Sequence, residues 1–268
     1  MHPLYSTLIQ KLHEFAKKEQ MERAVIGLSG GLDSAVAYMI AVRAFGPQNV
    51  TVLSLPEIGL TSNDDIDHAK RLSEHFNSPY HYQPINNFLV DFSFVTWDKT
   101  DEANHKLRAH IRAVLLSYFA KSHGCLILGT ANKSDLQIGY GNKEGEWIGD
   151  VQVRGDLYKS EVMELAQHMG LPEELVNKEP SRELHSYQSD EGDLGAPWSK
   201  IDDILKQLQD GIEPDALIQK GMDALTVHKI VRMMQQNESK VLPGSTLSAG
   251  HIKTAINKAQ EAEASTLI

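Results

Sequence analysis

The sequence predicts an α/β fold in which a doubly wound, mainly parallel five-stranded sheet carries helices on both faces. Short apolar runs typical of strands occur at residues 23–28, 50–55, 79–83 and 125–129. Segments with apolar residues at helical spacing separate these runs. A turn rich in serine and glycine leads from the first run straight into a helix, so the first two strands are expected to form a βαβ unit with a right-handed crossover.

The periodicity of apolar residues also indicates where the helices lie. In chain order, they are expected at about residues 1–20, 33–45, 61–76, 103–122 and 159–169, then a short one from residue 172, and two more near 201–208 and 227–234. Gly124 is expected to end the long helix, because glycine readily adopts the left-handed backbone of a helix C-terminus. The run that follows Gly124 is wholly apolar and is therefore expected to be a central strand.

Two segments lack a regular pattern. Residues 137–154 show no consistent period and contain several glycines, so we expect a long functional loop or lid there. Residues 185–195 are acidic and contain glycine, and we expect them to be exposed or ordered only with a ligand. Neither segment is expected to contribute a strand or a helix.

The chain is expected to form a single domain over residues 1–268, since its length and 41% hydrophobic content suffice for one sizeable core. Residues 1–20 are predicted to be an amphipathic N-terminal helix and 21–180 the α/β core. Residues 181–268 are predicted to be a helical C-terminal part. Its last segment is either a solvated helix or a frayed tail.

Composition disfavours several classes of protein. The formal net charge of −10 argues against a protein that coats nucleic acid, because binding to phosphates requires clustered lysine and arginine. No apolar run reaches the roughly 18 residues of a membrane span, and residues 1–5 do not begin a secretory signal. We therefore expect a cytoplasmic protein with neither a nucleic-acid nor a membrane partner. The single cysteine, Cys125, is expected to be a core residue.

The stretch over residues 24–34 (Ala-Val-Ile-Gly-Leu-Ser-Gly-Gly-Leu-Asp-Ser) has the features of a phosphate-binding loop. Gly30 and Gly31 permit close approach of backbone N–H groups to an anion, and the N-terminus of the following helix adds a partial positive charge. Asp33, expected at an exposed loop edge, supplies a carboxylate suited to Mg²⁺. The stretch matches neither a P-loop nor a dinucleotide fingerprint. The alternative interpretation is an ordinary strand-to-helix turn.

Further polar residues follow other strands at the same edge of the sheet. Thr130 and Asp135 come directly after the apolar run 125–129, so Asp33 and Asp135 could share one cation. Leu55 ends the second strand where ligands of open α/β sheets bind, and it either forms a wall for adenine or simply precedes Pro56. The histidines show no matched pair that would indicate zinc.

The motif Ser-Gly-Gly-Leu-Asp-Ser at residues 29–34 resembles the pyrophosphate loop of ATP pyrophosphatases that adenylate a substrate, a group that also includes GMP synthetases, asparagine synthetases and tRNA-thiolating enzymes. Three further blocks, at residues 129–134, 155–159 and 179–191, occur in the order seen in ammonia-dependent NAD synthetases. The resemblance covers roughly residues 24–205. It implies a Rossmann-like fold of the adenine nucleotide alpha hydrolase type.

That resemblance implies two-step chemistry with ATP as cosubstrate and Mg²⁺ as cofactor. The nicotinate carboxylate of deamido-NAD would attack the α-phosphorus of ATP and release pyrophosphate, and ammonia would then displace AMP to give NAD. The ATP contacts would be Gly27, Leu28, Ser29, Gly30, Gly31, Leu32, Asp33, Ser34, Leu55, Thr130, Lys159 and Ser181. The catalytic residues would be Asp33 and Lys159, the Mg²⁺ ligands Asp33 and Asp135, and the deamido-NAD contacts His110, Lys143, Asp150, Ser239 and Lys240.

Three positions depart from the pattern of that family. Asp135 replaces a glutamate and so has a shorter reach to a metal ion. His110 stands where relatives carry an arginine, and it cannot make the two-pronged contact of a guanidinium. Ser239 precedes Lys240 in place of a histidine. These departures concern the dinucleotide more than ATP.

No second domain with a catalytic cysteine is recognised, so ammonia is the expected nitrogen source, with a separate ammonia-supplying protein as an open option. The family resemblance also implies a homodimer whose interface completes the dinucleotide site. Two alternatives stay open: an adenylating ligase of the same family that acts on another carboxylate or carbonyl substrate, and a nucleotide-binding dimer with a regulatory role.

Overall fold

The structure, a computed structural model, describes residues 3–141, 145–178, 180–181, 188–237 and 245–246. Its centre is an all-parallel sheet with the strand order β3-β2-β1-β4-β5-β6. The strands are β1 Ala24–Gly27, β2 Val50–Ser54, β3 Tyr80–Tyr82, β4 Leu126–Asn132, β5 Val151–Arg154 and the two-residue β6 Ser245–Thr246. The predicted α/β fold with a five-stranded parallel sheet is therefore confirmed, and β6 is added at one edge.

The order of the strands reverses at the centre of the sheet. From β1 the chain proceeds to β2 and β3 on one side, and it then returns to place β4 on the other side of β1. In open α/β sheets the crevice at such a switch point, outside the carboxyl ends of the strands, is where ligands bind. The serine–glycine turn after β1 lies at this crevice.

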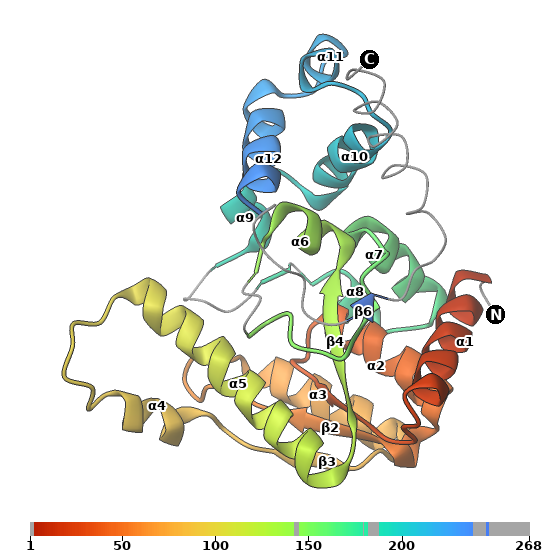
Figure 1. Cartoon of the computed structure of the whole chain (residues 1–268), viewed down its shortest axis with the longest axis vertical. Helices are drawn as coiled ribbons and strands as arrows, with labels where there is room; N and C mark the ends of the chain where they lie inside the picture. Colours follow the sequence, from red (N-terminus) through yellow and green to blue (C-terminus); the bar gives the residue numbers. More distant parts are fainter. Residues whose placement is uncertain (1–2, 142–144, 179, 182–187, 238–244, 247–268) are drawn as a thin grey trace, which may run out of the picture.

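Helices cover both faces of the sheet (Figure 1). The helices are α1 Pro3–Lys18, α2 Leu32–Phe45, α3 Asn63–Phe76, α4 Asn86–Phe92, α5 Asp101–His123, α6 Lys133–Ile138, α7 Lys159–His168, α8 Glu173–Val176, α9 Asp190–Leu194, α10 Trp198–Gln209, α11 Pro214–Gln219 and α12 Ala224–Asn237, and a 3₁₀ turn spans Pro47–Asn49. The larger core joins one face of the sheet to α1, α2, α7 and α8. A second core packs α4 and α5 on the other face.

Local signals set several helix ends as expected. Ser62 caps α3 by accepting a hydrogen bond from the Asp65 N–H (3.1 Å). Gly124 ends α5 in the left-handed conformation, with a φ of +61°. Strand β4, which begins with the apolar run after Gly124, is central, and Cys125 beside it is buried, which raises the pKa of its thiol. No helix in the described part of the chain is long and apolar enough to cross a bilayer.

The helices from α9 to α12 build a core of their own above the sheet (Figure 1). This core includes Trp198 and Ile201 of α10, together with Tyr158 and Ile138 from the α/β part. The expectation of an exposed segment at 185–195 is wrong for Asp190–Leu194, which forms α9 and buries Leu194. Residues 182–187 lie outside the described residues.

The expected loop over residues 137–154 is wrong at both of its ends. Helix α6 extends to Ile138, and β5 Val151–Arg154 is a fully buried strand. Alternate β5 residues are polar, which concealed the strand in the sequence. Gln152 is satisfied by its neighbours, because its Oε1 accepts from the Ala131 N–H (3.1 Å) and its Nε2 donates to the Trp147 carbonyl (2.7 Å).

Candidate active site

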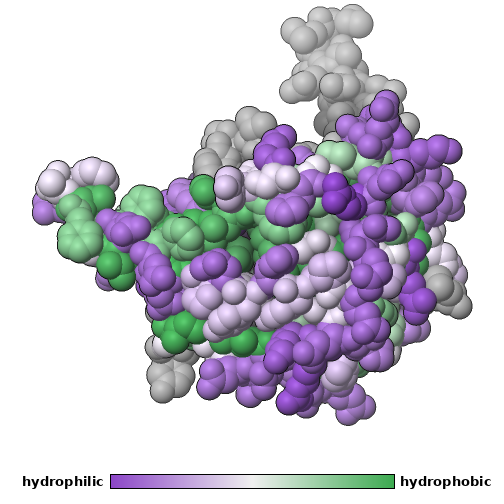
Figure 2. All heavy atoms as spheres, turned by 90° about the horizontal axis from the view of Figure 1, so that it is seen from below, coloured by the Kyte–Doolittle hydropathy of each residue, from purple (hydrophilic) through white to green (hydrophobic). Residues whose placement is uncertain are grey.

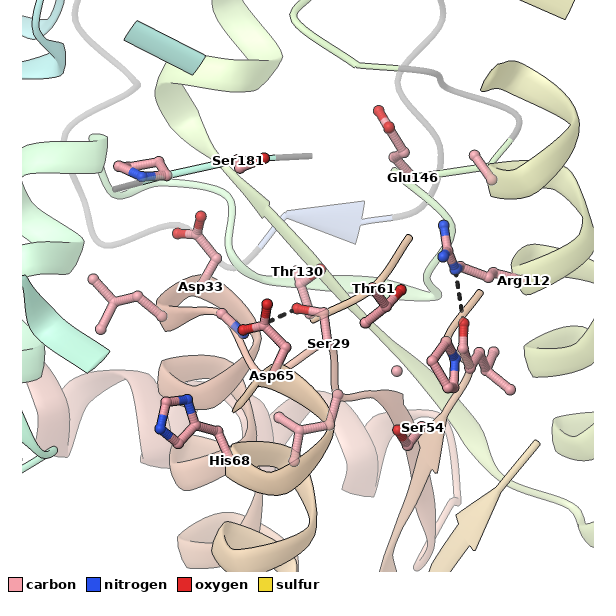
Figure 3. A pocket seen from close by; sticks show the side chains of 18 of the residues that line it. Ser29, Asp33, Ser54, Thr61, Asp65, His68, Arg112, Thr130, Glu146 and Ser181 are labelled. Carbon is pink, nitrogen blue, oxygen red and sulfur yellow. Dashed lines mark hydrogen bonds between the residues drawn. The ribbon is translucent and has the colours of Figure 1, made fainter. Parts of the chain in front are cut away.

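A pocket of about 990 Å³ opens at the carboxyl edge of the sheet, at the switch point between β1 and β4. This volume lies at the upper end of the range of roughly 300–1,000 Å³ for small-molecule sites. The lining comes from the turn after β1, the end of β2, the start of α3, one side of α5, and the segments around Thr130 and Lys159. Figure 3 shows Ser29, Asp33 and Thr130 facing this space, with Arg112 and Glu146 at its other end.

Serine hydroxyls hold the turn after β1 in shape. Ser34 Oγ accepts from the Ser29 N–H (3.2 Å) and donates to the Gly31 carbonyl (3.0 Å). Ser29 Oγ accepts from the Gly31 N–H (3.2 Å) and lies 3.0 Å from Ser34 Oγ. Gly27, Leu28, Ser29, Gly31, Leu32 and Asp33 line the pocket, whereas Gly30 and Ser34 lie behind this lining. The structure thus brings the expected ATP residues of this turn together. Most of them line the pocket, and Ser34 stabilises the turn through its hydrogen bonds.

Replacing Gly30 with alanine is expected to destabilise the protein by at least about 2 kcal/mol. Gly30 has a φ of +86°, and a Cβ there would overlap the backbone carbonyl of Asp65 in α3. Gly31→Ala is the matched control, because Gly31 has a φ of −86° and its added methyl would meet only Ser29 Oγ at 3.4 Å. Chemical denaturation of both variants checks the difference, and equal stabilities would contradict the close approach of α3 to Gly30.

Asp33 lies between two cations in the first turn of α2. Arg154 Nη1 donates to its Oδ1, and Lys159 Nζ donates to its Oδ2. Burial opposes the charged form of Asp33, but the charges of Arg154 and Lys159 outweigh it and hold the pKa of this carboxyl well below its ordinary value. The expectation of Asp33 at an exposed loop edge is wrong, since only 31% of its side chain is exposed.

Arg154 is a site residue that sequence reasoning missed. It ends β5, is fully buried, and also donates through Nη2 to the Thr130 carbonyl. The sequence predicts a loop over residues 137–154, and it therefore assigns no role to Arg154. The alternation of Val151 and Val153 with polar residues was the one signal that could have located the strand.

The two carboxylates expected to bind Mg²⁺ both line the pocket. Asn132 caps α6, in whose first turn Asp135 lies: its Oδ1 accepts from the Asp135 N–H (3.0 Å), and its Nδ2 donates to Asp135 Oδ2 (2.7 Å). Within the described residues, no group of three or more His, Cys, Asp or Glu side chains could hold a metal ion. Two carboxylates fit Mg²⁺ only when phosphate oxygens and water complete its six ligands, as is common for this ion.

The other end of the pocket is framed by α5 and the end of β2. Leu55 lines it, and its carbonyl accepts from Arg112 Nε (2.9 Å), as the dashed line in Figure 3 shows. One turn away, Arg108 forms an ion pair with Glu57. Thr130 and Ser181 also line the pocket, and Ser181 Oγ donates to Gln188 Oε1 (2.8 Å). Arg112 therefore lies at this end of the pocket, whereas Arg108 is paired with Glu57 and is not among the lining residues.

Of the residues expected to contact a dinucleotide, the two that the structure describes, His110 and Asp150, do not line the pocket. His110 is half-buried on α5 but is not among the pocket-lining residues, whereas Ala109 and Arg112 are. Asp150 lies near the start of β4 and accepts from the Ile127 N–H (2.8 Å), which stabilises the sheet rather than the pocket. Lys143, Ser239 and Lys240 lie outside the described residues.

A second ion pair was also missed. Lys178, after α8, pairs with Asp65 at the start of α3, and both residues line the pocket. Asp65 is buried and also accepts from Ser62 Oγ (2.7 Å). This ion pair links two segments that are more than a hundred residues apart in the sequence, so no local pattern could predict it.

Fold and pocket together define a nucleotide-binding α/β protein, in which a serine–glycine turn at a parallel-sheet switch point lies beside a carboxylate and a lysine. A family model described as NAD synthase matches residues 4–243. The chain belongs to the NAD synthase family.

Individual relatives agree with this membership. The NH(3)-dependent NAD(+) synthetase of Chlorobaculum tepidum is 35% identical over 217 residues, which cover 81% of this chain and 78% of that protein. The protein of the same name from Methanocaldococcus jannaschii is 34% identical, with 87% and 93% covered. Among solved structures, an NMN synthetase from Francisella tularensis superimposes with a TM-score of 0.76 at 27% identity, with 88% and 93% covered. An NH3-dependent NAD synthetase from Campylobacter jejuni gives 0.73 at 29% identity, with 87% and 93% covered.

Proposed function

We propose that this protein is a ligase that converts deamido-NAD to NAD with ammonia and ATP, through an adenylated intermediate. The observation that carries the proposal is the contact of Asp33 and Lys159 with each other at the serine–glycine turn, inside a pocket large enough for more than one ligand. Names of the relatives, most of them NH(3)-dependent NAD(+) synthetases, support the same reaction.

The residues of the pocket divide the work between binding and charge stabilisation. The turn after β1 offers backbone N–H groups and Ser29 to the β- and γ-phosphates of ATP. Lys159 Nζ would neutralise the negative charge that develops as pyrophosphate leaves. Leu55 and Thr130 would border the adenosine, and Ser181 would contact a phosphate from the opposite wall. Ammonia would then attack the adenylated carboxylate and release AMP.

Mg²⁺ is proposed to arrive with ATP, held by Asp33 and Asp135 together with phosphate oxygens. When bound, it would neutralise charge on the phosphates. Asp135, which Asn132 already fixes through two hydrogen bonds, needs no rearrangement to face the pocket. Removal of Mg²⁺ with a chelator should therefore stop pyrophosphate release.

A homodimer is also part of the proposal. Six large apolar side chains on and near α4 and α5 are 47–77% exposed: Val90, Phe92, Phe94, Trp97, Val114 and Tyr118. Figure 2 shows hydrophobic residues gathered on the side of the molecule where the segment between these helices protrudes. An apolar surface of this kind suits an interface between two copies of the chain. We place the dimer in the cytoplasm, where an accompanying protein could supply the ammonia.

One observation favours a second candidate reaction. The structure with a TM-score of 0.76 is named an NMN synthetase, whose product is a mononucleotide. An adenylating ligase for a different nicotinate carboxylate therefore stays open. Purified protein with ATP, Mg²⁺ and ammonium should be assayed with deamido-NAD and, separately, with nicotinate mononucleotide. A higher kcat/KM for deamido-NAD supports the proposal, and a higher kcat/KM for the mononucleotide replaces it with the second reaction.

His110→Arg is expected to lower the KM for deamido-NAD by about tenfold, if a charge-assisted hydrogen bond worth roughly 1.4 kcal/mol is gained. Arginine would supply a permanent forked donor one residue from Ala109 in the pocket wall. ATP kinetics should hardly change. Steady-state kinetics at pH 6 and pH 8 check this prediction. Identical affinities for wild type and variant at both pH values would show that position 110 does not contact the substrate.

A further inference from the structure

The two cations around Asp33 differ in their surroundings. Arg154 has 0% of its surface exposed and is not part of the described pocket lining, whereas Lys159 lines the pocket. Arg154 holds Asp33 Oδ1 through Nη1 and the Thr130 carbonyl through Nη2, so its guanidinium is tied to both α2 and β4. Lys159 holds Asp33 Oδ2 from the pocket side. Asp33 Oδ1 is thus bound by a cation in the protein interior, and Asp33 Oδ2 is bound by a cation that lines the pocket.

This difference decides which contact can break. If Arg154 left Asp33, a fully buried guanidinium would lose its carboxylate, which is strongly unfavourable. Its Nε already has no hydrogen-bond partner among the described residues. Lys159 has an alternative, because any anion in the pocket can take the place of Asp33. Its Nζ also lies 6.0 Å from the centre of the Trp198 ring, which offers a second favourable contact for the cation.

We propose that Arg154 is a positioning residue that fixes Asp33 Oδ1, and that Lys159 exchanges Asp33 Oδ2 for a phosphate oxygen when a polyphosphate enters the pocket. Asp33 then occupies, in the ligand-free protein, the position that a phosphate oxygen takes beside Lys159. The exchange leaves Asp33 Oδ2 free, and Arg154 keeps the carboxylate in place. The inference rests on the proposed function, since it takes the turn after β1 as a phosphate site.

Inorganic pyrophosphate in the presence of a chelator tests the exchange without any metal. By isothermal titration calorimetry, Asp33→Asn should bind pyrophosphate about tenfold more tightly than wild type, because Lys159 no longer has a competing carboxylate. Asp64→Asn is the matched control: Asp64 lines the same pocket and its loss removes the same charge. The gain for Asp64→Asn should be clearly smaller. In a Lys159→Met background, the gain for Asp33→Asn should shrink to that of the control.

The role of Arg154 is tested by a double-mutant cycle. Arg154→Met should weaken pyrophosphate binding several-fold, because Asp33 would then attract Lys159 alone. If Arg154 acts through Asp33, this loss should largely disappear when Asp33→Asn is already present. A loss of equal size in both backgrounds would mean that Arg154 acts only through its distant charge, which would overturn its positioning role. Should Arg154→Met fail to fold, Arg154→Lys keeps the charge but lacks the fork that reaches both Asp33 and Thr130.

The outcomes separate this inference from the proposed function. Equal gains in pyrophosphate affinity for Asp33→Asn and Asp64→Asn would overturn the exchange while leaving the phosphate site intact. A weaker affinity for Asp33→Asn than for wild type would overturn it as well. Absence of pyrophosphate binding in every variant, together with absence of ATP turnover in the native protein, would reject the proposed function itself.

Discussion

Replacing Asp33 with asparagine is expected to lower ATP-dependent pyrophosphate release by about 10²–10³-fold. The substitution removes a carboxylate that faces the pocket and that we assign to Mg²⁺. It also removes the anionic partner of the buried Arg154, so the free energy of unfolding should fall by about 3–5 kcal/mol. A pyrophosphate-release assay and thermal denaturation measure the two effects.

The pH dependence of this stability term has a definite sign. Because the pKa of Asp33 is lowered on folding, its contribution is complete above its unfolded value of about 3.9 and is lost as the pH falls through the folded value. The stability difference between wild type and Asp33→Asn should therefore be constant from pH 6 to pH 8. Asp64→Asn is the control for both the stability and the pyrophosphate-release measurements, since it removes the charge of an exposed carboxylate that lines the same pocket. Equal rates of pyrophosphate release for Asp33→Asn and wild type would contradict the metal-ligand assignment.

Lys159→Met should lower kcat by roughly 10²–10³-fold while changing the KM for ATP much less. Lys159 is 2% exposed, and it begins α7 with its Nζ beside Asp33. Such a cation acts most strongly on charge that appears during displacement of pyrophosphate. Single-turnover and steady-state kinetics separate the chemical step from ATP binding.

Lys178→Met serves as the control for this prediction. Lys178 lines the same pocket, but it pairs with Asp65 rather than Asp33. Its loss should change kcat by less than about tenfold, because its partner is Asp65 and not the carboxylate that Lys159 contacts. A raised KM for ATP with an unchanged kcat in Lys159→Met would show that Lys159 only binds the ground state.

Much of the fold could be predicted because its signals are local. Ser62 caps α3 and Gly124 ends α5, each through the chemistry of one residue and its nearest neighbours. The turn after β1 could be recognised because its conformation requires a particular run of serine and glycine. Strand β5 could not, because its polar residues are buried by partners elsewhere in the chain, as the bonds of Gln152 to Ala131 and Trp147 illustrate.

The sequence by itself determined the α/β class, the parallel strands, the serine–glycine turn and the two residues, Asp33 and Lys159, that meet beside it. These follow from periodicity, helix caps and motif residues, which act over a few positions of the chain. Only the tertiary structure decided that Asp33 is paired twice, by partners 121 and 126 residues away. A buried charge finds its counter-charge through the packing of α2 against β4, β5 and α7, and that packing depends on the whole core rather than on any short stretch.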